Sequence, residues 1–264
     1  MKTLLVTGAA GGVAARIRPL LREHYQLRLL DRIAVADPVA NESVVVADLA
    51  DRQAVLQACE GVDAILHLAC AHALDIAFEA TLDPNYRGTL YLLDACQQLG
   101  IERFVFASSH HVLGAHPTGS FSGDDAVLAP DGFYALSKVF GEAAVAMYAH
   151  RIGLRALNIR IGSAGDQAVD ARRLRLWVSS RDLVQLIRIG LEHPQVQCET
   201  VYGVSRCPQA LFANARARAL GYNPQDHADD HRSTGFVELA AMPSSEGPHH
   251  VGGPYIPQVL KLDL

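Results

Sequence analysis

Short apolar runs that alternate with longer amphipathic stretches are the feature that most constrains this chain. The runs are rich in Val, Ile and Leu and are typical of strands buried on both faces, while the stretches between them have the length and period of helices. The expected strands cover 3–6, 27–30, 44–46, 64–68 and 104–107, and the expected helices cover 13–22, 52–59 and 86–99. Alternation of this kind predicts a parallel sheet with helices on its faces.

The alternation continues past Gly132 and then weakens. We expect a helix after Gly132, a strand over 156–161, a helix over 181–192, a strand over 200–202 and a helix over 209–220. The sequence therefore predicts a single α/β, doubly wound domain over 1–222, with a small C-terminal portion whose segments around 163–180 and 203–222 bind substrate. Residues 223–264 are rich in Pro, Gly, Ser and His, and we expect an irregular tail there.

Charge and hydropathy exclude several kinds of partner. The chain carries 23 Lys and Arg against 28 Asp and Glu, so it lacks the basic surface that a phosphate backbone attracts. No apolar stretch reaches the roughly 18 residues that span a bilayer, and the first residues lack the apolar region of a secretion signal. The five cysteines have no paired spacing and are expected to be reduced thiols. We expect a cytoplasmic protein with no nucleic-acid or membrane partner.

A glycine-rich loop follows the first expected strand. Residues 7–14 read Thr-Gly-Ala-Ala-Gly-Gly-Val-Ala and lead directly into a helix, which is the context that a dinucleotide-binding loop requires. Gly8 and Gly11 allow a tight turn and the close approach of the backbone to a pyrophosphate, and the free N–H groups of the helix N-terminus would bind its oxygens. The loop therefore predicts a Rossmann-type fold with a bound dinucleotide.

Two aspartates follow the next two strands. Asp31 ends the second strand about twenty residues after the loop, where a carboxylate accepts hydrogen bonds from ribose hydroxyls and repels a 2′-phosphate. This favours NAD, although the neighbouring Arg32 leaves the strictness of that preference open. Asp48 closes the third strand and is placed to contact the adenine edge. A helix N-cap is an equally good account of Asp48.

Three polar side chains predict proton transfer beside the nucleotide. Tyr134 and Lys138 lie one helical turn apart on the same face of the helix expected after Gly132. A neighbouring ammonium favours the phenolate of a tyrosine and would let it act as a base at neutral pH. Ser109 ends the fifth strand, at the carboxyl edge where open α/β sheets bind their ligands.

In this order the motifs resemble the extended branch of the short-chain dehydrogenase/reductases, the NAD-dependent epimerase/dehydratase type. The resemblance covers residues 1 to about 222 and implies that Tyr134 is the general acid/base, that Lys138 lowers its pKa and holds the nicotinamide ribose, and that Ser109 orients the reacting hydroxyl. Asn85, in the Asn-Tyr-Arg-Gly-Thr segment, matches the element that steadies the site around the lysine. The resemblance also implies a homo-oligomer and NAD as the cofactor, bound by Gly8, Ala10, Gly11, Gly12, Val13, Asp31, Arg32, Asp48, Leu49, Leu68, Ala69, Cys70, Asn85, Tyr134, Lys138 and Ile161.

Three segments narrow the resemblance further. Residues 106–111, 133–142 and 159–163, followed by Arg172 and Trp177, resemble uronate dehydrogenases, which oxidise C1 of galacturonate or glucuronate to a lactone. The resemblance implies that Arg172 clamps the sugar carboxylate with help from Ser163, and a planar guanidinium suits that pairing. The alternative is that Arg172, Arg173 and Arg175 form a solvated loop face. The implied substrate-binding residues are His72, Ser109, His110, His111, Tyr134, Ser163 and Arg172.

Two histidines depart from the uronate dehydrogenase pattern. His72 stands where that family has a substrate-contacting Ser, and His110 where it has a substrate-contacting Asn. Potentially cationic imidazoles suit a different anion, so an alternative function is a sulfoquinovose 1-dehydrogenase that forms 6-deoxy-6-sulfogluconolactone. An alternative of another class is a non-catalytic NAD-sensing protein. No metal site is expected, because the adjacent His110 and His111 at a strand end should point apart and no further ligand has a suitable spacing.

Overall fold

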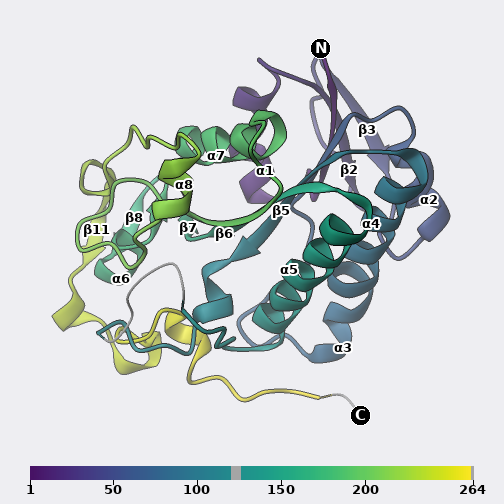
Figure 1. The fold of residues 1–264 in the computed structure, drawn as a ribbon. Coiled ribbons are helices and arrows are strands. Elements are labelled where there is room, and N and C mark those ends of the chain that lie inside the picture. The colour runs from purple at the N-terminus through teal and green to yellow at the C-terminus, as the bar shows by residue number, and fades with distance from the viewer. Residues whose placement is uncertain (120–125, 263–264) are drawn as a thin grey trace.

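A seven-stranded sheet with the order β10-β6-β5-β4-β1-β2-β3 forms the centre of the molecule (Figure 1). The structure, a computed structural model, describes residues 1–119 and 126–262. All neighbouring strands of this sheet run parallel, which confirms the doubly wound α/β fold expected from the alternating pattern. Its strands are β1 (Thr3–Thr7), β2 (Gln26–Asp31), β3 (Glu42–Val46), β4 (Ala64–His67), β5 (Arg103–Ser109), β6 (Arg155–Ile161) and β10 (Cys198–Gly203).

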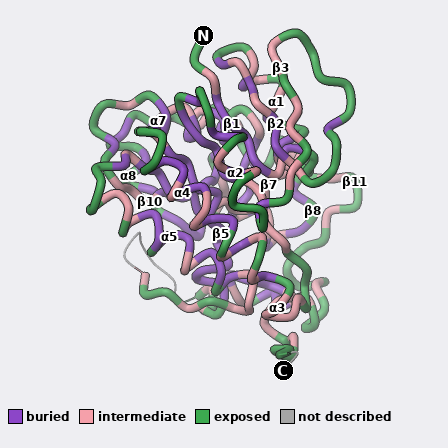
Figure 2. Tube along the Cα trace, turned by 90° about the vertical axis from the view of Figure 1, so that its right-hand side faces the viewer, coloured by how far each residue is buried: buried purple, intermediate pink, exposed green. Residues whose placement is uncertain are grey.

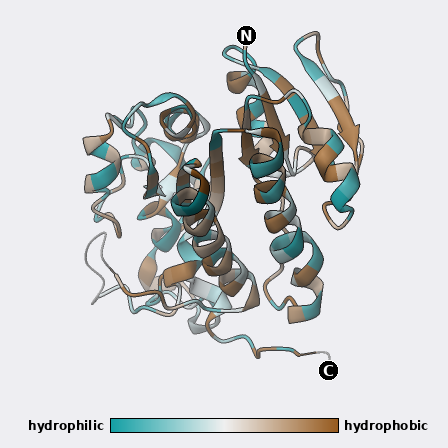
Figure 3. Ribbon diagram, turned by 45° about the vertical axis from the view of Figure 1, so that its right-hand side comes forward, coloured by the Kyte–Doolittle hydropathy of each residue, from teal (hydrophilic) through white to brown (hydrophobic). Residues whose placement is uncertain are grey.

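Helices cover both faces of the sheet. On one face, Ile17 of α1 (Gly12–Leu21) and Leu186 of α7 (Ser180–Glu192) share an apolar core with the strands. On the other face, α2 (Arg52–Cys59), α4 (Gly88–Leu99) and α5 (Phe133–Ile152) bury a second core that includes Leu92 and Val145. The central strands are accordingly buried in Figure 2 and apolar in Figure 3. Within the described part of the chain, no helix is long and apolar enough to cross a membrane.

Helical structure before α4 begins earlier than the sequence pattern indicates. A short helix, α3 (Phe78–Thr81), leads into a π-helical turn over Leu82–Arg87 and then into α4. The turn contains Pro84 and few apolar side chains, so it carries no helical period. A wide turn of this kind is a frequent feature of functional sites, and it holds Asn85 beside the end of β4.

A small portion lies beside the sheet, near the ends of β6 and β10 (Figure 1). It contains two strand pairs, β7 (Ser163–Ala164) with β9 (Trp177–Val178) and β8 (Ala168–Asp170) with β11 (Arg232–Val237), and the helix α6 (Ala171–Leu174). The strand β11 lies in the segment expected to be an irregular tail. Its side chains are mostly exposed, so its pairing with β8 left no apolar pattern in the sequence. The tail otherwise contains short 3-10 turns over Ala228–His231, Leu239–Ala241, Ser244–Glu246 and Gly253–Tyr255.

The prediction of a helix over 209–220 is wrong for most of that range, since only α8 (Ala215–Ala219) forms. Gln209 and Asn214 have φ values of 46° and 54°, in the left-handed region that interrupts a helix. The Asn214 side chain accepts a hydrogen bond from the backbone N–H of Tyr202 and donates one to its carbonyl. It thereby ties this segment to the edge strand β10, and the apolar side chains before it pack there as loop residues.

Candidate active site

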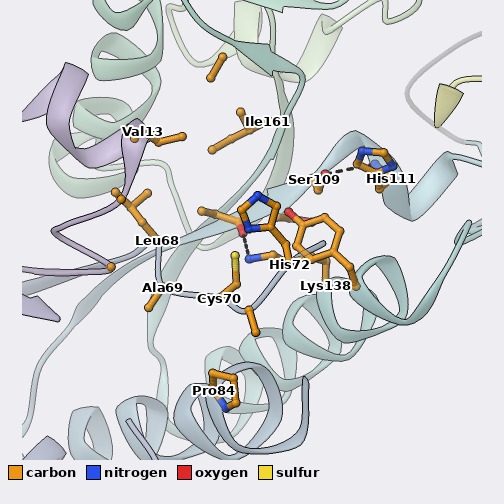
Figure 4. A pocket seen from close by; sticks show the side chains of 18 of the residues that line it. Val13, Leu68, Ala69, Cys70, His72, Pro84, Ser109, His111, Lys138 and Ile161 are labelled. Carbon is orange, nitrogen blue, oxygen red and sulfur yellow. Dashed lines mark hydrogen bonds between the residues drawn. The ribbon is translucent and has the colours of Figure 1, made fainter. Parts of the chain in front are cut away.

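A cavity of about 760 Å³ opens at the carboxyl ends of the parallel strands (Figure 4). Ala10, which is exposed, and Asn85, which is buried behind the cavity, do not line it. All other residues that the sequence singled out line the cavity, namely Gly8, Gly11, Gly12, Val13, Asp31, Arg32, Asp48, Leu49, Leu68, Ala69, Cys70, His72, Ser109, His110, His111, Tyr134, Lys138, Ile161, Ser163 and Arg172. The fold thus brings the glycine loop, the pair Tyr134 and Lys138, and Arg172 to one cavity.

The glycine loop has the geometry that a dinucleotide needs. Gly8 has a φ of +69°, and a Cβ there would lie 2.6 Å from the Ala69 nitrogen, so no other residue fits without rearrangement. Helix α1 begins without a side-chain cap at Gly11, which leaves its first N–H groups for a phosphate. The Asp31 carboxylate accepts the backbone N–H groups of Ala10 and Ile33 at 3.0 and 3.1 Å. These bonds hold the Asp31 side chain in place at the cavity wall.

Asp48 is not the N-cap of the following helix. Within the described part of the chain, its carboxylate accepts only the N–H of Ala50, at 2.9 Å. The side chain that caps α2 is Asp51, which accepts from Gln53 and Ala54. The N-cap account of Asp48 is therefore wrong, and Asp48 lines the cavity on the Asp31 side.

Tyr134, Lys138 and Ser109 meet in the middle of the cavity. Tyr134 and Lys138 come from the first turns of α5, and the Lys138 Nζ lies 5.6 Å from the centre of the Tyr134 ring. The same Nζ donates a hydrogen bond of 2.7 Å to the carbonyl of Ala107 on β5. Ser109 ends β5 and hydrogen-bonds with the Tyr134 phenol. A sugar hydroxyl between Ser109 and Tyr134 would meet both groups at once.

Burial dominates the acid–base behaviour of Tyr134. The pKa of Tyr134 is raised well above its ordinary value, first by burial and then by the neighbouring Cys70 thiol, and the hydrogen bond from Ser109 opposes that rise. Burial therefore favours the protonated phenol and opposes the expected effect of the Lys138 ammonium, which favours the phenolate.

Asn85 supports the site from behind. Its amide donates to the Ala71 carbonyl at 2.9 Å and to Ser137 Oγ at 2.9 Å, and its oxygen accepts from the Ala71 nitrogen at 2.7 Å. These bonds join the loop after β4 to helix α5. Asn85 does not line the cavity, and it contacts α5 at Ser137, the residue directly before Lys138.

Arg172 and His110 form the end of the cavity beyond Tyr134. Arg172 is 5% exposed, and its Nη1 donates to the Val251 carbonyl at 2.9 Å. The Arg172 Nε and the His110 Nε2 are buried and have no hydrogen-bond partner among the described residues. Buried polar groups normally have a hydrogen-bond partner, so these two nitrogens indicate that a polar ligand binds here. The solvated-face account of the arginine cluster is wrong for Arg172.

The two adjacent histidines do not point apart, contrary to the expectation from a strand. The chain turns into a 3-10 helix at His110–Leu113, and the two rings lie 4.1 Å apart, centre to centre. Burial keeps the pKa of His110 well below its ordinary value, so the ring is neutral. Its Nδ1 contacts the Ile161 carbonyl at 3.0 Å and must carry the hydrogen there. The His110 Nε2 is therefore an acceptor, suited to a hydroxyl and not to an anion.

A buried carboxylate supports His111. His111 Nδ1 lies 2.6 Å from Asp131 Oδ2, and the Asp131 side chain is fully buried. Burial lowers the pKa of His111 to about 3 and raises the pKa of Asp131 to about 7. Burial therefore favours a neutral His111 ring, and one hydrogen lies between Nδ1 and Oδ2.

The raised pKa of Asp131 predicts a loss of stability with rising pH. Because the folded-state pKa lies above the unfolded value, ionisation opposes folding between about pH 4 and pH 7. We expect Asp131 to cost on the order of 2 kcal/mol of unfolding free energy between pH 5 and pH 8. Asp131→Asn should lack this loss when urea unfolding is measured at both pH values. Asp166→Asn, at an exposed carboxylate, should keep the wild-type slope, and equal slopes for all three proteins would contradict the assignment.

The C-terminal segment supplies a wall that sequence reasoning missed. Gly252, Pro254 and Tyr255 line the cavity, and the Tyr255 ring lies 4.1 Å from the His111 ring. Gly253 has a φ of +62°, and a Cβ there would lie 2.5 Å from the Arg172 guanidinium, in the space beside its Nε. The Gly-Gly-Pro-Tyr turn was visible in the sequence, but only the folded chain brings it to Arg172.

Comparison with known proteins agrees with this geometry. The uronate dehydrogenase of Pseudomonas putida is 38% identical over 94% of this chain and 92% of its own length. A crystal structure of a point variant of uronate dehydrogenase from Agrobacterium tumefaciens, in complex with NAD, has a TM-score of 0.92 and 32% identity over the full length of both chains. Glucuronic acid dehydrogenase from Chromohalobacter salexigens has a TM-score of 0.90 and 33% identity over 98% of this chain and 97% of its own.

The family pattern covers the first part of the fold, from the glycine loop to the start of the small portion beside the sheet. Residues 4–164 match the NAD dependent epimerase/dehydratase family, a span that runs from β1 to β7 and includes the glycine loop, Ser109, Tyr134 and Lys138. The chain therefore belongs to the NAD dependent epimerase/dehydratase family, as its motifs indicated.

Proposed function

We propose that this protein oxidises the C1 hydroxyl of a uronate-type sugar acid to its lactone, with NAD as the hydride acceptor. The observation that carries the proposal is the order of groups along one cavity. Asp31 and the glycine loop lie at one end, and Ser109, Tyr134 and Lys138 lie in the middle. At the other end is the Arg172 Nε, which has no hydrogen-bond partner among the described residues. The similarity to uronate dehydrogenases over most of the chain supports the same reaction.

The cofactor end suits NAD better than NADP. Phosphate oxygens would accept hydrogen bonds from the uncapped N-terminus of α1, and the Asp31 carboxylate would accept those of the adenosine ribose. A 2′-phosphate would be repelled by Asp31. The exposed Arg32 is free to turn into solvent, and Lys138 would donate to the nicotinamide ribose while it holds its bond to Ala107.

In the reaction, this chain moves one proton and aligns the sugar. NAD, when bound, supplies the hydride acceptor and the positive charge of its oxidised nicotinamide ring. That charge, together with Lys138, counters the burial that keeps Tyr134 protonated. Tyr134 then removes the proton of the C1 hydroxyl, which Ser109 holds, while the C1–H bond breaks and the lactone carbonyl forms.

Arg172 would hold the carboxylate of the sugar. The burial of its guanidinium lowers the pKa to about 10, which still leaves the group charged at neutral pH. Ser163, which begins β7 two residues after the end of β6, lines the same cavity and would assist. A neutral His110 would accept a hydrogen bond from a ring hydroxyl through Nε2, and Tyr255 would close the site against His111.

The sulfonate alternative has one remaining support in the structure. His110 is neutral and offers an acceptor, so it does not favour a sulfonate. His72 lines the cavity, and its hydrogen bond with Cys70 raises the pKa of His72, which keeps a cationic imidazole available to a sulfonate. The preference for a carboxylate rests on the similarity to uronate dehydrogenases over most of the chain.

A substrate panel tests the proposal. We expect NADH absorbance with NAD and galacturonate or glucuronate, a much smaller kcat/KM with sulfoquinovose, and little activity with neutral glucose or galactose. NADP should support slower turnover than NAD. A larger kcat/KM with sulfoquinovose would establish the alternative, and NAD binding without turnover of any acidic sugar would establish a non-catalytic sensor.

We also propose that the protein is a homo-oligomer in the cytoplasm, with residues 1–222 as one domain that the tail completes. The unpaired state of all five cysteines agrees with a reducing compartment. The exposed apolar side chains of Leu136, Met147 and Ile152 on α5 offer a surface for a second copy. Size-exclusion chromatography with light scattering measures the assembly directly.

A further inference from the structure

A thiol lies among the catalytic groups without a part in the proposed reaction. Cys70 follows β4 by three residues, lines the cavity and is only partly buried. His72 lines the same wall and forms a hydrogen bond with the Cys70 thiol, and Lys138 reaches the pair from α5. Figure 4 shows Cys70, His72 and Lys138 converging on one point of the cavity. A thiol between an imidazole and an ammonium has the surroundings of a reactive cysteine.

The other four cysteines have different surroundings. Cys59 and Cys96 are buried in the apolar core under α2 and α4, and burial raises the pKa of both thiols, to about 12 for Cys59. Cys207 donates its hydrogen to the Trp177 carbonyl, and burial raises its pKa to about 12. Burial also raises the pKa of Cys198 on β10. None of these four cysteines lines the cavity.

Charge sets Cys70 apart from the other cysteines. Burial by itself would raise the pKa of the Cys70 thiol, but the Lys138 ammonium and the His72 hydrogen bond together bring it below its ordinary value. The same hydrogen bond raises the pKa of His72, so both shifts favour a proton on the imidazole over one on the thiol. The reactive form of a cysteine is the thiolate, and this arrangement favours it.

We propose that Cys70 is a modification site, which reacts with soft electrophiles and with hydrogen peroxide and whose modification stops turnover. With iodoacetamide, the thiolate sulfur attacks the methylene carbon, a C–S bond forms as the C–I bond breaks, and iodide leaves. With hydrogen peroxide, the sulfur attacks one oxygen, an S–O bond forms as the O–O bond breaks, and His72 gives its proton to the departing hydroxide. The sulfur is oxidised to a sulfenic acid and the peroxide is reduced to water.

Either modification blocks the cavity where the reaction takes place. The Cys70 side chain lies beside Lys138, and the His72 ring lies 5.8 Å from the Tyr134 ring, so an added group occupies space next to both catalytic side chains. The nicotinamide half of NAD belongs in the same space according to the proposed function. Bound NAD should therefore shield Cys70, and a modified Cys70 should exclude the nicotinamide.

Site-specific labelling tests this proposal. We expect iodoacetamide at neutral pH to label Cys70 at least about tenfold faster than any other cysteine. Only at Cys70 do the neighbouring side chains favour the thiolate, which is the reactive form. Peptide mass spectrometry measures the labelling and needs no sugar substrate, so the labelling test remains valid even if the proposed function is wrong. NAD should slow the labelling of Cys70, and His72→Gln should slow it by about tenfold. Labelling that falls first on another cysteine, or equally on all five, would overturn the proposal.

Inactivation is measured on the same samples. Each protein is compared with its own starting activity, so a change in the basal rate of a variant does not affect the result. The wild-type protein and Cys198→Ser should lose activity at the rate of Cys70 labelling, and Cys70→Ser should resist both reagents. Dithiothreitol should restore activity after peroxide and not after iodoacetamide. A fully labelled Cys70 with undiminished activity, or equal inactivation of Cys70→Ser, would contradict the proposed block.

Discussion

Tyr134→Phe is expected to lower kcat for a uronate by about 10³-fold and to leave the affinity for NAD nearly unchanged. The variant loses only the phenolic oxygen, while the ring keeps its place between the His72 and Tyr255 rings. Without that oxygen the proposed base is lost, and Ser109 is too weak a base to replace it. Steady-state kinetics and NAD titration by protein fluorescence measure the two effects separately.

The control for Tyr134→Phe is Tyr148→Phe. Tyr148 lies on the same helix, α5, and packs against the apolar core away from the cavity. It should keep wild-type kcat and KM, which shows that loss of a phenol from α5 is harmless elsewhere. A Tyr134→Phe variant with kcat close to that of Tyr148→Phe would disprove the role of Tyr134 as the base.

The pH profile should reflect the burial of Tyr134. Because burial raises the pKa of its phenol, the reactive phenolate becomes more abundant as the pH rises. Oxidation by the wild-type protein should therefore speed up from neutral to alkaline pH. The residual rate of Tyr134→Phe should lack this rise.

The sequence predicted the parallel sheet because each buried strand leaves a local pattern, a run of apolar residues, in the sequence. The strands β1, β4 and β5 are buried on both faces, so each reads as an uninterrupted apolar run. The paired strands β7 and β9 have two residues each, which is too short for any period to emerge. The left-handed Asn214 could not be foreseen either, because its conformation is stabilised by hydrogen bonds to Tyr202 on another element.

The candidate site was predictable where its residues follow strand ends. Gly8, Asp31 and Ser109 each stand at the carboxyl end of a parallel strand, and the topology brings such ends together. The wall from Gly252 to Tyr255 comes from the far end of the chain and was missed. Nor could the sequence give the state of His110, since its neutral charge results from burial and its tautomer from the Ile161 carbonyl.

Arg172→Ala should raise the KM for a uronate by on the order of 10²-fold, with a smaller effect on kcat. Arg172 is buried, one of its nitrogens is held by Val251, and its Nε has no partner within the described chain. The variant removes the cation that would neutralise the buried carboxylate. Removing one partner of such a pair costs about 3 to 5 kcal/mol, and relaxation and entering water would recover part of it.

A matched set of variants separates charge from geometry and from fold. Arg172→Lys retains a positive charge but loses the planar fork, so its KM should lie between those of the wild type and Arg172→Ala. Arg175→Ala should behave as wild type, because Arg175 contacts the Gln209 carbonyl outside the cavity. Thermal unfolding checks that loss of the Val251 bond leaves the fold intact. Equal KM values of Arg172→Ala and Arg175→Ala for galacturonate would mean that the anion is bound elsewhere. A fold defect could not explain that result, because it would raise the KM of Arg172→Ala and not keep it equal.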